Sequence, residues 1–390
     1  MVKPLSRNLA SAIVIALVIS GATAVRADDG DSRSNRFVVT NLTSNLKGVA
    51  PNMDPVLQNA WGVAFSPGAS PFWIADNATG CSTLYDGQGA IASTLQVKIP
   101  LPGGSVPSIA CKPAKSNTSP TPAAPTGVVW NPNPNFLVPN QSTSTPAIFI
   151  FDTEDGTISA WAGGLTPADQ AVLAVDNSGS GAVYKGLVFG TNAKGVFLFA
   201  TNFFAGTVDV FGPATASSNG MYTPVTTDGG FLDPDIPSGF APFGIQNING
   251  DLFVTYAKQK LPDKHDDMAG PGNGFVDVFD TNGHLLRRFA SQGPLNSPWG
   301  VARASFAFGR FSGDILVGNF GDGKIHAFDS DGHFLGTLRD VNGKPIIIDG
   351  LWTLTLGGGR NSNSDTLYFT AGPDDETNGL FGTITPASKQ

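Results

Sequence analysis

A short pattern that recurs six times limits what this chain can fold into more than any other feature of its sequence. In each copy, a turn is followed by an aromatic or small residue, a glycine and a short apolar strand. The glycine position is filled by Gly62, Gly127, Gly186, Gly244 and Gly300, and by Thr353 in the last copy. Successive positions lie 53 to 65 residues apart, as in repeat architectures whose units each contain several strands.

Each copy begins a unit of four predicted strands. A second apolar strand ends in polar residues, as at 72–77, and a third has alternating residues, as at 275–279. A tight turn such as Asn282 and Gly283 then leads to the fourth. Six units of four antiparallel strands predict an all-β, six-bladed β-propeller, because stacking the sheets around an axis buries both faces of each blade. A two-sheet β-sandwich is the alternative.

The ends of the chain predict how the ring closes. The last unit has strands near 351–356, 366–370 and 379–384 but lacks a fourth, while 36–42 is a strand without a unit of its own. Placing 36–42 as the fourth strand of the last blade completes the ring and protects sheet edges. One propeller domain is therefore expected over 36–386. A flexible N-terminal tail is expected at 28–35 and a short tail at 387–390.

Residues 1–27 have the layout of a secretory signal peptide. Basic Lys3 and Arg7 precede a nearly unbroken apolar run at 9–19, and small residues follow up to Ala27. The run is shorter than the ~20 residues that span a membrane, although an uncleaved anchor is the alternative. We therefore expect a secreted or periplasmic protein that is soluble and monomeric after cleavage and has no membrane span.

Charge and cysteine content limit the partners of the mature protein. The chain has 23 basic and 31 acidic residues, and removal of 1–27 takes away three basic ones, so the formal charge falls from −8 to −11. An acidic surface repels phosphate backbones, which argues against nucleic acid and leaves cations, sugars or neutral ligands. The two cysteines, Cys81 and Cys111, can form a disulfide in an exported protein or remain unpaired thiols.

A candidate binding site follows from the loops. Because strand direction alternates, loops between second and third strands emerge on the same face as the loops that join blades. These loops are rich in acidic and amide side chains, and the loop at 257–274 is the longest. We predict that they bind a ligand at the channel mouth, although each residue alone can simply form a turn. The candidates are Asp76, Asn77, Asn202, Tyr256, Lys258, Asn319, Asp322, Asp374, Asp375 and Glu376.

Two kinds of chemistry are open to this rim. Oxygen-rich side chains suit Ca²⁺ as a cofactor, and 152–156 loosely resembles a Ca²⁺ loop without the terminal Glu of an EF-hand. The candidate metal ligands are Asp76, Asn202, Asn319 and Asp374. A histidine beside carboxylates can act as a general base or metal ligand, or can simply be solvated. The catalytic candidates are therefore His265, Asp266 and Asp267.

Several longer motifs add a resemblance to this interpretation. They lie at 61–65, 75–77, 153–158, 183–187, 241–247, 264–267, 272–280, 293–300 and 370–376. With these motifs the chain resembles, over nearly all of 36–385, a family of exported bacterial proteins of uncharacterised function. The resemblance implies an NHL-like β-propeller and supplies no catalytic residues. Some members end in a PEP-CTERM sorting signal, but no apolar helix and basic tail precede Gln390.

Three functions remain open at this stage. The leading hypothesis is a non-enzymatic protein that binds a small polar ligand, a cation or an exported protein partner at the channel mouth. The second is a metal-dependent hydrolase or lactonase, a class that includes some six-bladed propellers. The third is an interaction scaffold that uses only its outer rim. The sequence contains no GxSxG, HExxH, Walker or dinucleotide-binding motif.

Overall fold

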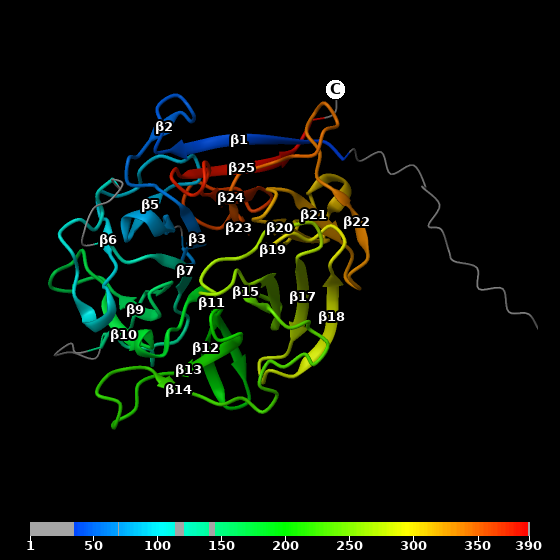
Figure 1. Cartoon of the computed structure of the whole chain (residues 1–390). Coiled ribbons are helices and arrows are strands. Elements are labelled where there is room, and N and C mark those ends of the chain that lie inside the picture. The colour runs from blue at the N-terminus through cyan, green and yellow to red at the C-terminus, as the bar shows by residue number, and fades with distance from the viewer. Residues whose placement is uncertain (1–34, 69, 114–120, 140–144, 389–390) are drawn as a thin grey trace, which may run out of the picture. The chain divides into compact units, whose positions relative to one another are not determined.

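Six β-sheets surround a common centre in the computed structural model (Figure 1). The structure describes residues 35–68, 70–113, 121–139 and 145–388. The predicted signal peptide and nearly all of the predicted 28–35 tail lie outside these residues. Within them, the only helices are the short 3-10 segments η1 (Asn77–Thr79), η2 (Pro102–Gly104), η3 (Ser178–Ser180) and η4 (Gly309–Phe311). None has the length and hydropathy of a membrane-crossing helix.

Five blades are continuous segments with their strands in sequence order. Blade 1 contains β3 (Ala60–Ala64), β4 (Phe72–Asp76), β5 (Cys81–Tyr85) and β6 (Val97–Lys98). Blade 2 contains β7 (Pro125–Trp130), β8 (Phe149–Thr153), β9 (Thr157–Trp161) and β10 (Val172–Asp176). Blade 3 contains β11 (Tyr184–Asn192), β12 (Gly195–Asn202), β13 (Thr207–Gly212) and β14 (Thr223–Pro224).

The remaining blades complete the circle. Blade 4 contains β15 (Phe240–Ile248), β16 (Asp251–Lys258), β17 (Gly274–Phe279) and β18 (Leu285–Ser291). Blade 5 contains β19 (Pro298–Arg303), β20 (Ile315–Asn319), β21 (Ile325–Phe328) and β22 (Phe334–Thr337). Blade 6 contains β23 (Leu351–Leu356), β24 (Leu367–Ala371), β25 (Leu380–Pro386) and β1 (Phe37–Ser44), with the short β2 (Asn52–Met53) added beside β1.

The repeated glycine lies where the inner strands crowd together. Each inner strand contacts the inner strand of the next blade, and β23 contacts β3, so the six-bladed propeller predicted from the sequence is confirmed. A Cβ atom at Gly62 would lie 2.6 Å from Thr126 O, which is closer than real Cβ atoms approach. The last copy tolerates Thr353 because its hydroxyl donates a hydrogen bond to Trp61 O at 2.7 Å.

The hydrophobic core lies between adjacent blades rather than inside one sheet. All five residues of β4 and of β20 are buried, as expected for strands covered on both faces. Aromatic rings fill the space between neighbouring sheets: Trp73 of blade 1 stacks on Phe149 of blade 2 at 4.2 Å. On the other side of blade 1, Phe72 stacks on Tyr368 of blade 6 at 4.8 Å. Each blade therefore depends on both neighbours to bury its faces.

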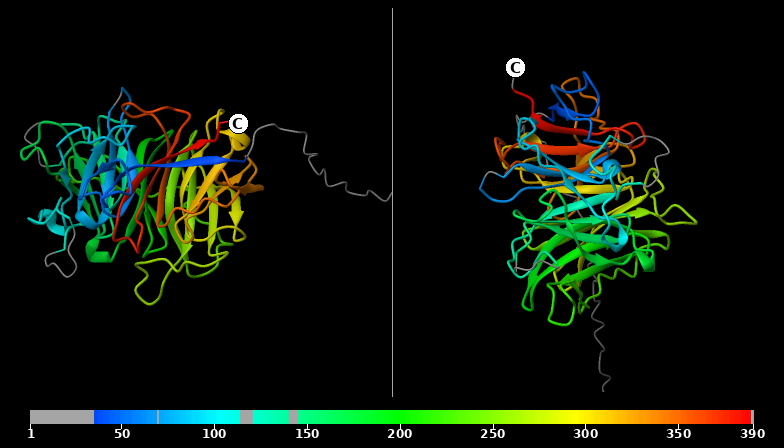
Figure 2. Two further views of the ribbon diagram at one scale, coloured as in Figure 1. Left: turned by 90° about the horizontal axis from the view of Figure 1, so that it is seen from above. Right: turned by 90° about the vertical axis from the view of Figure 1, so that its left-hand side faces the viewer.

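Strand β1 closes the ring by pairing with β25 near the other end of the chain. The two strands are antiparallel, with Phe37 opposite Pro386 and Thr43 opposite Phe381, and one bulge interrupts the register. Figure 2 shows β1 in blue lying along β25 in red. This is the pairing that the sequence predicts for 36–42. It is anchored by Phe37, whose ring stacks on that of Phe308 at 4.8 Å and is 1% exposed.

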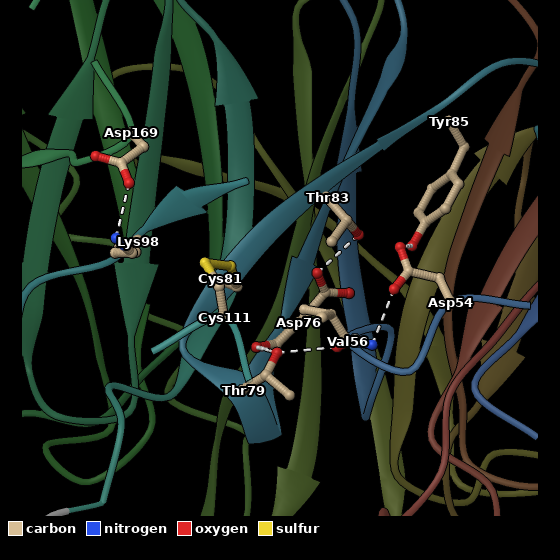
Figure 3. The surroundings of a disulfide bond; sticks show 10 residues. All are labelled: Asp54, Val56, Asp76, Thr79, Cys81, Thr83, Tyr85, Lys98, Cys111 and Asp169. Carbon is tan, nitrogen blue, oxygen red and sulfur yellow. Dashed lines mark hydrogen bonds and ion pairs between the residues drawn. A yellow bond between two sulfur atoms is a disulfide. The ribbon is translucent and has the colours of Figure 1, made fainter. Parts of the chain in front are cut away.

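A disulfide stabilises the outer part of blade 1. It joins Cys81 of β5 to Cys111 in the loop after β6, with 5.1 Å between the Cα atoms (Figure 3). In the same region, Lys98 of β6 forms an ion pair with Asp169 at 2.7 Å, and Lys98 N–H donates to Asp169 O. The short fourth strand of blade 1 is thereby connected to blade 2.

Replacement of Phe37 by alanine tests the closure. Removal of its buried ring leaves a cavity beside Phe308, so Phe37→Ala should lower the free energy of unfolding by about 3–5 kcal/mol. Val38→Thr on the same strand is the control, because Val38 is 40% exposed and the change keeps β-branching. Urea unfolding followed by tryptophan fluorescence measures both. Equal effects of the two changes would contradict closure by Phe37.

Candidate functional site

In four blades the residue before the glycine position is aromatic, and the four rings meet at the centre of the propeller. Trp61, Phe243, Trp299 and Trp352 occupy this position in four blades. The rings of Trp61 and Trp352 are stacked 3.5 Å apart, and the ring of Trp299 lies edge-on to both. With Phe203 and Phe320 these side chains form one cluster, which we call the aromatic layer. Below it, Val63, Val128 and their equivalents line a narrow cavity of about 60 Å³.

Lysine replaces the aromatic residue in blade 3. The ammonium group of Lys185 lies 5.2 Å from the ring centroid of Trp61 and 5.9 Å from that of Phe203. Only 4% of its side chain is exposed, and it forms an ion pair with Glu154 from the β8–β9 turn. A buried ammonium group is costly unless paired, and the carboxylate and the aromatic faces both compensate it.

Asparagine side chains connect this ion pair to blades 1 and 6. Asn77 Nδ2 donates to Glu154 Oε2 at 2.9 Å, and Asn59 Nδ2 donates to Asn77 Oδ1 at 3.1 Å. Asn59 Nδ2 also donates to Glu376 Oε2 at 2.6 Å, while Asn59 Oδ1 accepts from the indole of Trp352 at 3.0 Å. The chain of hydrogen bonds therefore crosses the joint between the first and last blades.

The long loop of blade 4 adds a histidine to this group. His265 Nδ1 lies 2.8 Å from Asp266 Oδ1 and 4.0 Å from Glu154 Oε1. The two side chains are 44% and 58% exposed, so they form the accessible edge of an otherwise buried group. We call this group the mouth cluster. It consists of Asn59, Asn77, Glu154, Lys185, His265, Asp266 and Glu376.

The backbone that carries Glu376 has an uncommon conformation. The φ values of Asp374, Asp375 and Glu376 are 57°, 50° and 64°. They lie in the left-handed region, which residues other than glycine rarely adopt. Backbone hydrogen bonds hold the turn, including Glu376 N–H to Gly372 O at 3.1 Å. Strained backbone of this kind is concentrated at functional sites, where it places a side chain. Here it directs Glu376 to Asn59.

Burial and charge shift the protonation of the mouth cluster. Burial raises the pKa of Glu376 to about 7, and the nearby carboxylate of Glu154 adds to the effect while Lys185 opposes it. The hydrogen bond that the His265 imidazole donates to Asp266 raises the pKa of His265 and lowers the pKa of Asp266. Glu376 can therefore gain or lose a proton near neutral pH.

The structure brings four of the predicted site residues into the mouth cluster: Asn77, His265, Asp266 and Glu376. Asp267 lies beside them, half-buried at the base of the loop, where its backbone pairs with Gln259. Burial raises the pKa of the Asp267 carboxyl.

The other predicted ligand-binding residues make local contacts instead. Asp76 Oδ2 accepts from Thr83 inside blade 1, as Figure 3 shows. Tyr256 is buried in the core of blade 4. Lys258 O accepts from Met268 N–H at the base of its loop. Asp375 is exposed in the turn before Glu376.

The remaining four residues, Asn202, Asn319, Asp322 and Asp374, lie in blades 3, 5 and 6. Asn202 donates to Asp209, Asn319 donates to Asp322, and Asp374 accepts from Asn378. No hydrogen bond among the described residues joins any two of Asp76, Asn202, Asn319 and Asp374. Binding of Ca²⁺ by these four residues therefore stays a prediction, and their contacts favour local structural roles.

Three members of the mouth cluster are absent from the predicted site residues: Asn59, Glu154 and Lys185. Glu154 lies in the segment that resembles a Ca²⁺ loop, but its neighbours point elsewhere. Asp152 Oδ1 accepts from Gly127 N–H at 2.5 Å, and Asp155 Oδ2 accepts from Ala124 N–H at 2.8 Å. Lys185 has a sequence signal, because it is the only charged residue among the six positions before the repeated glycine.

The protonation of Glu376 gives a test by pH. The pKa of Glu376 is about 7 in the folded protein and 4.5 ordinarily, so protonation of this group stabilises the folded state. The stabilising contribution is complete below about pH 4.5. That contribution is lost as pH rises through 7. When the pH rises from about 5 to about 8, the free energy of unfolding should therefore fall less in Glu376→Gln than in the wild type. The difference between the two decreases should be roughly 1–3 kcal/mol. Urea unfolding at both pH values measures this, with Asp375→Asn as the control. Equal pH dependence in Glu376→Gln and wild type would contradict it.

Comparison with known proteins identifies relatives but no activity. No family model matches the sequence. Among solved structures, virginiamycin B lyase from Staphylococcus aureus is 14% identical with a TM-score of 0.43, covering 90% of this chain and 99% of that one. A luciferin-regenerating enzyme is 12% identical with a TM-score of 0.46, covering 90% and 95%. At these values neither name transfers to this chain.

Two curated proteins are closer in sequence, and both are from Acanthamoeba polyphaga mimivirus. "Uncharacterized protein R648" is 31% identical over 344 residues, which is 88% of this chain and 78% of the viral protein. "Uncharacterized protein L690" is 31% identical over 348 residues, covering 89% and 85%. Because these relatives are viral, membership of a bacterial family with a sorting signal stays a prediction. Identity and coverage together show that this chain belongs to the family of the mimivirus proteins R648 and L690.

Proposed function

We propose that this protein is exported and binds a small polar ligand at the mouth of the propeller channel. The observation that carries the proposal is the mouth cluster, in which charged and amide side chains from five blades form one connected group that is buried except at its edge. Turn formation accounts for polar residues on loops, but it does not account for a buried ion pair shared between blades.

The energetic argument concerns Lys185 and Glu154. Their side chains are 4% and 12% exposed, and removing two charges from water costs several kcal/mol, which their attraction only partly offsets. Apolar residues at these positions would stabilise the propeller at least as well. Retention of the pair therefore favours a role in binding, where the desolvated charges and the amides of Asn59 and Asn77 give a polar ligand fixed partners.

Accessibility and hydrogen-bonding capacity support the same conclusion. His265 and Asp266 are exposed at the edge of the mouth cluster, so a solute reaches it without a change of the fold. The indole N–H of Trp61 is buried beneath Lys185 and makes no hydrogen bond within the described residues. The groups present donate and accept, which suits a ligand with hydroxyl, amide or carboxyl groups.

An enzyme of the hydrolase or lactonase type is the second candidate. The pKa of about 7 at Glu376 favours it, because proton transfer is most efficient for a group that titrates near neutral pH. The imidazole of His265, in the same cluster, is a second group that can carry a proton. Ester or lactone hydrolysis by the wild type that is lost in His265→Ala would support this candidate over simple binding.

A thermal-shift screen tests the binding proposal. The probes are sugars, hydroxy acids and amino acids at millimolar concentration, each tested both with and without a chelator. A compound at 100 times its Kd stabilises the folded protein by about 2.7 kcal/mol, so binders raise the melting temperature. We expect that stabilisation to be lost in Asn77→Ala and Glu154→Gln.

The control for this screen is Asp331→Asn, in an exposed turn of blade 5 outside the mouth cluster. It should respond like the wild type. Equal stabilisation of all the variants would place binding elsewhere, for example at the cavity beside Lys98 and Lys112. If no compound in the panel stabilises the wild type, binding of a small polar ligand is contradicted.

A further inference from the structure

We propose that Glu154, His265 and Asp266 bind one divalent transition-metal ion at the mouth. The inference rests on the proposed function, because the ion would lie in the same mouth cluster and hold a polar ligand there. It is argued from the donor atoms, their support and their chemistry.

The three donor atoms already lie close together. A ring nitrogen of His265 and one carboxylate oxygen each of Asp266 and Glu154 all lie within 4.8 Å of one another. For bonds of ~2.1 Å, two donors on one tetrahedral ion are roughly 3.4 Å apart. His265 Nδ1 lies 2.8 Å from Asp266 Oδ1 and 4.0 Å from Glu154 Oε1, one distance below that value and one above it. Small side-chain rotations are therefore enough to form the site.

Each donor is held by contacts outside the site. Glu154 Oε2 accepts from Asn77, which leaves Oε1 directed to Lys185 and His265. The loop of His265 and Asp266 is closed by backbone hydrogen bonds: Lys260 N–H donates to Asp266 O at 2.8 Å, and Met268 N–H donates to Lys258 O at 2.7 Å. Such support orients metal ligands and raises affinity.

The charges of the mouth cluster favour an added cation. The cluster contains the carboxyl groups of Glu154 and Asp266, which would both coordinate the ion, and one ammonium group, from Lys185. Lys185 also contacts Glu154 Oε1, so the ion would share that oxygen with it. Three protein donors leave a coordination position for an oxygen of the ligand, as in metal sites that bind substrates.

The donor set selects the metal. Ca²⁺ takes oxygen ligands, whereas an imidazole nitrogen with carboxylates suits Zn²⁺ and other transition metals. The inferred ion is therefore a transition metal such as Zn²⁺, whereas the oxygen-rich composition of the loops alone favours Ca²⁺.

A second group of similar composition provides a contrast. Asp329, Asp331 and His333 also have donor atoms within 4.8 Å of one another. Their contacts belong to a hairpin turn, in which Asp329 Oδ1 accepts from the N–H groups of Asp331 and His333. The same turn recurs at 280–284, where Asn282 takes the place of the second acid, so it forms for its own hydrogen bonds. It is therefore the matched control.

Titration with metal alone tests the inference. Calorimetry of the untagged, chelator-treated mature chain should show saturable Zn²⁺ binding to a single site, with much weaker binding of Ca²⁺. His265→Ala and Asp266→Asn should each weaken Zn²⁺ binding by about 10-fold or more. His333→Ala should leave it unchanged. Both His265 and Asp266 are exposed, and circular dichroism verifies that the variants are folded.

Several results would overturn the metal site. These are no saturable Zn²⁺ binding to the wild type, equal affinity in His265→Ala, or an equal loss in His333→Ala. Tighter binding of Ca²⁺ than of Zn²⁺ would overturn the choice of metal. The ligand screen with chelator separates the two proposals: if compounds still bind at the mouth while Zn²⁺ does not, only the metal inference fails.

Discussion

Close approach of the inner strands around the axis is the constraint on which the rest of this molecule depends. At Gly244, a Cβ atom would lie 2.2 Å from Trp299 O of the next blade, and at Gly300 it would lie 2.4 Å from Trp352 O. At four of the five glycines a Cβ atom would lie 2.7 Å or less from a neighbouring atom, and the sixth copy accommodates Thr353 with its hydrogen bond to Trp61 O. The preceding residue of each strand is thereby fixed at the axis. The aromatic layer and Lys185 follow from that placement.

The mouth cluster is consequently a property of the whole ring. Its members come from different blades: Lys185 from blade 3, Glu154 from blade 2, Asn77 and the loop residue Asn59 from blade 1, and Glu376 from blade 6. Each contact crosses from one blade to another or joins a blade to its preceding loop. A small rotation of one blade would separate them. The packing of aromatic rings between blades, such as Trp73 on Phe149, is what holds the distances in the cluster.

The fold could be predicted from the sequence because the pattern that specifies each blade repeats along the chain. Six glycine positions at similar spacing and an unpaired strand at 36–42 predict both the blade count and the closure. The site was only partly predictable. Polar loop residues gave Asn77, His265, Asp266 and Glu376, but composition cannot distinguish them from Asp76 or Asn319, which end buried strands and bond within their own blades. Lys185 and Glu154 meet only after folding, so a comparison of equivalent positions among the blades was needed to notice Lys185.

The pairing of β1 with β25 has a consequence for how the molecule is made. The two strands are more than 300 residues apart in sequence, so the first strand to be synthesised waits for the last before it gains its partner. Contacts between such distant segments form slowly because a very large loop must close. Until then, β1 presents free backbone groups that neighbouring chains can pair with. A folding factor that covers β1 until β25 has been synthesised would therefore protect the chain from association with its neighbours.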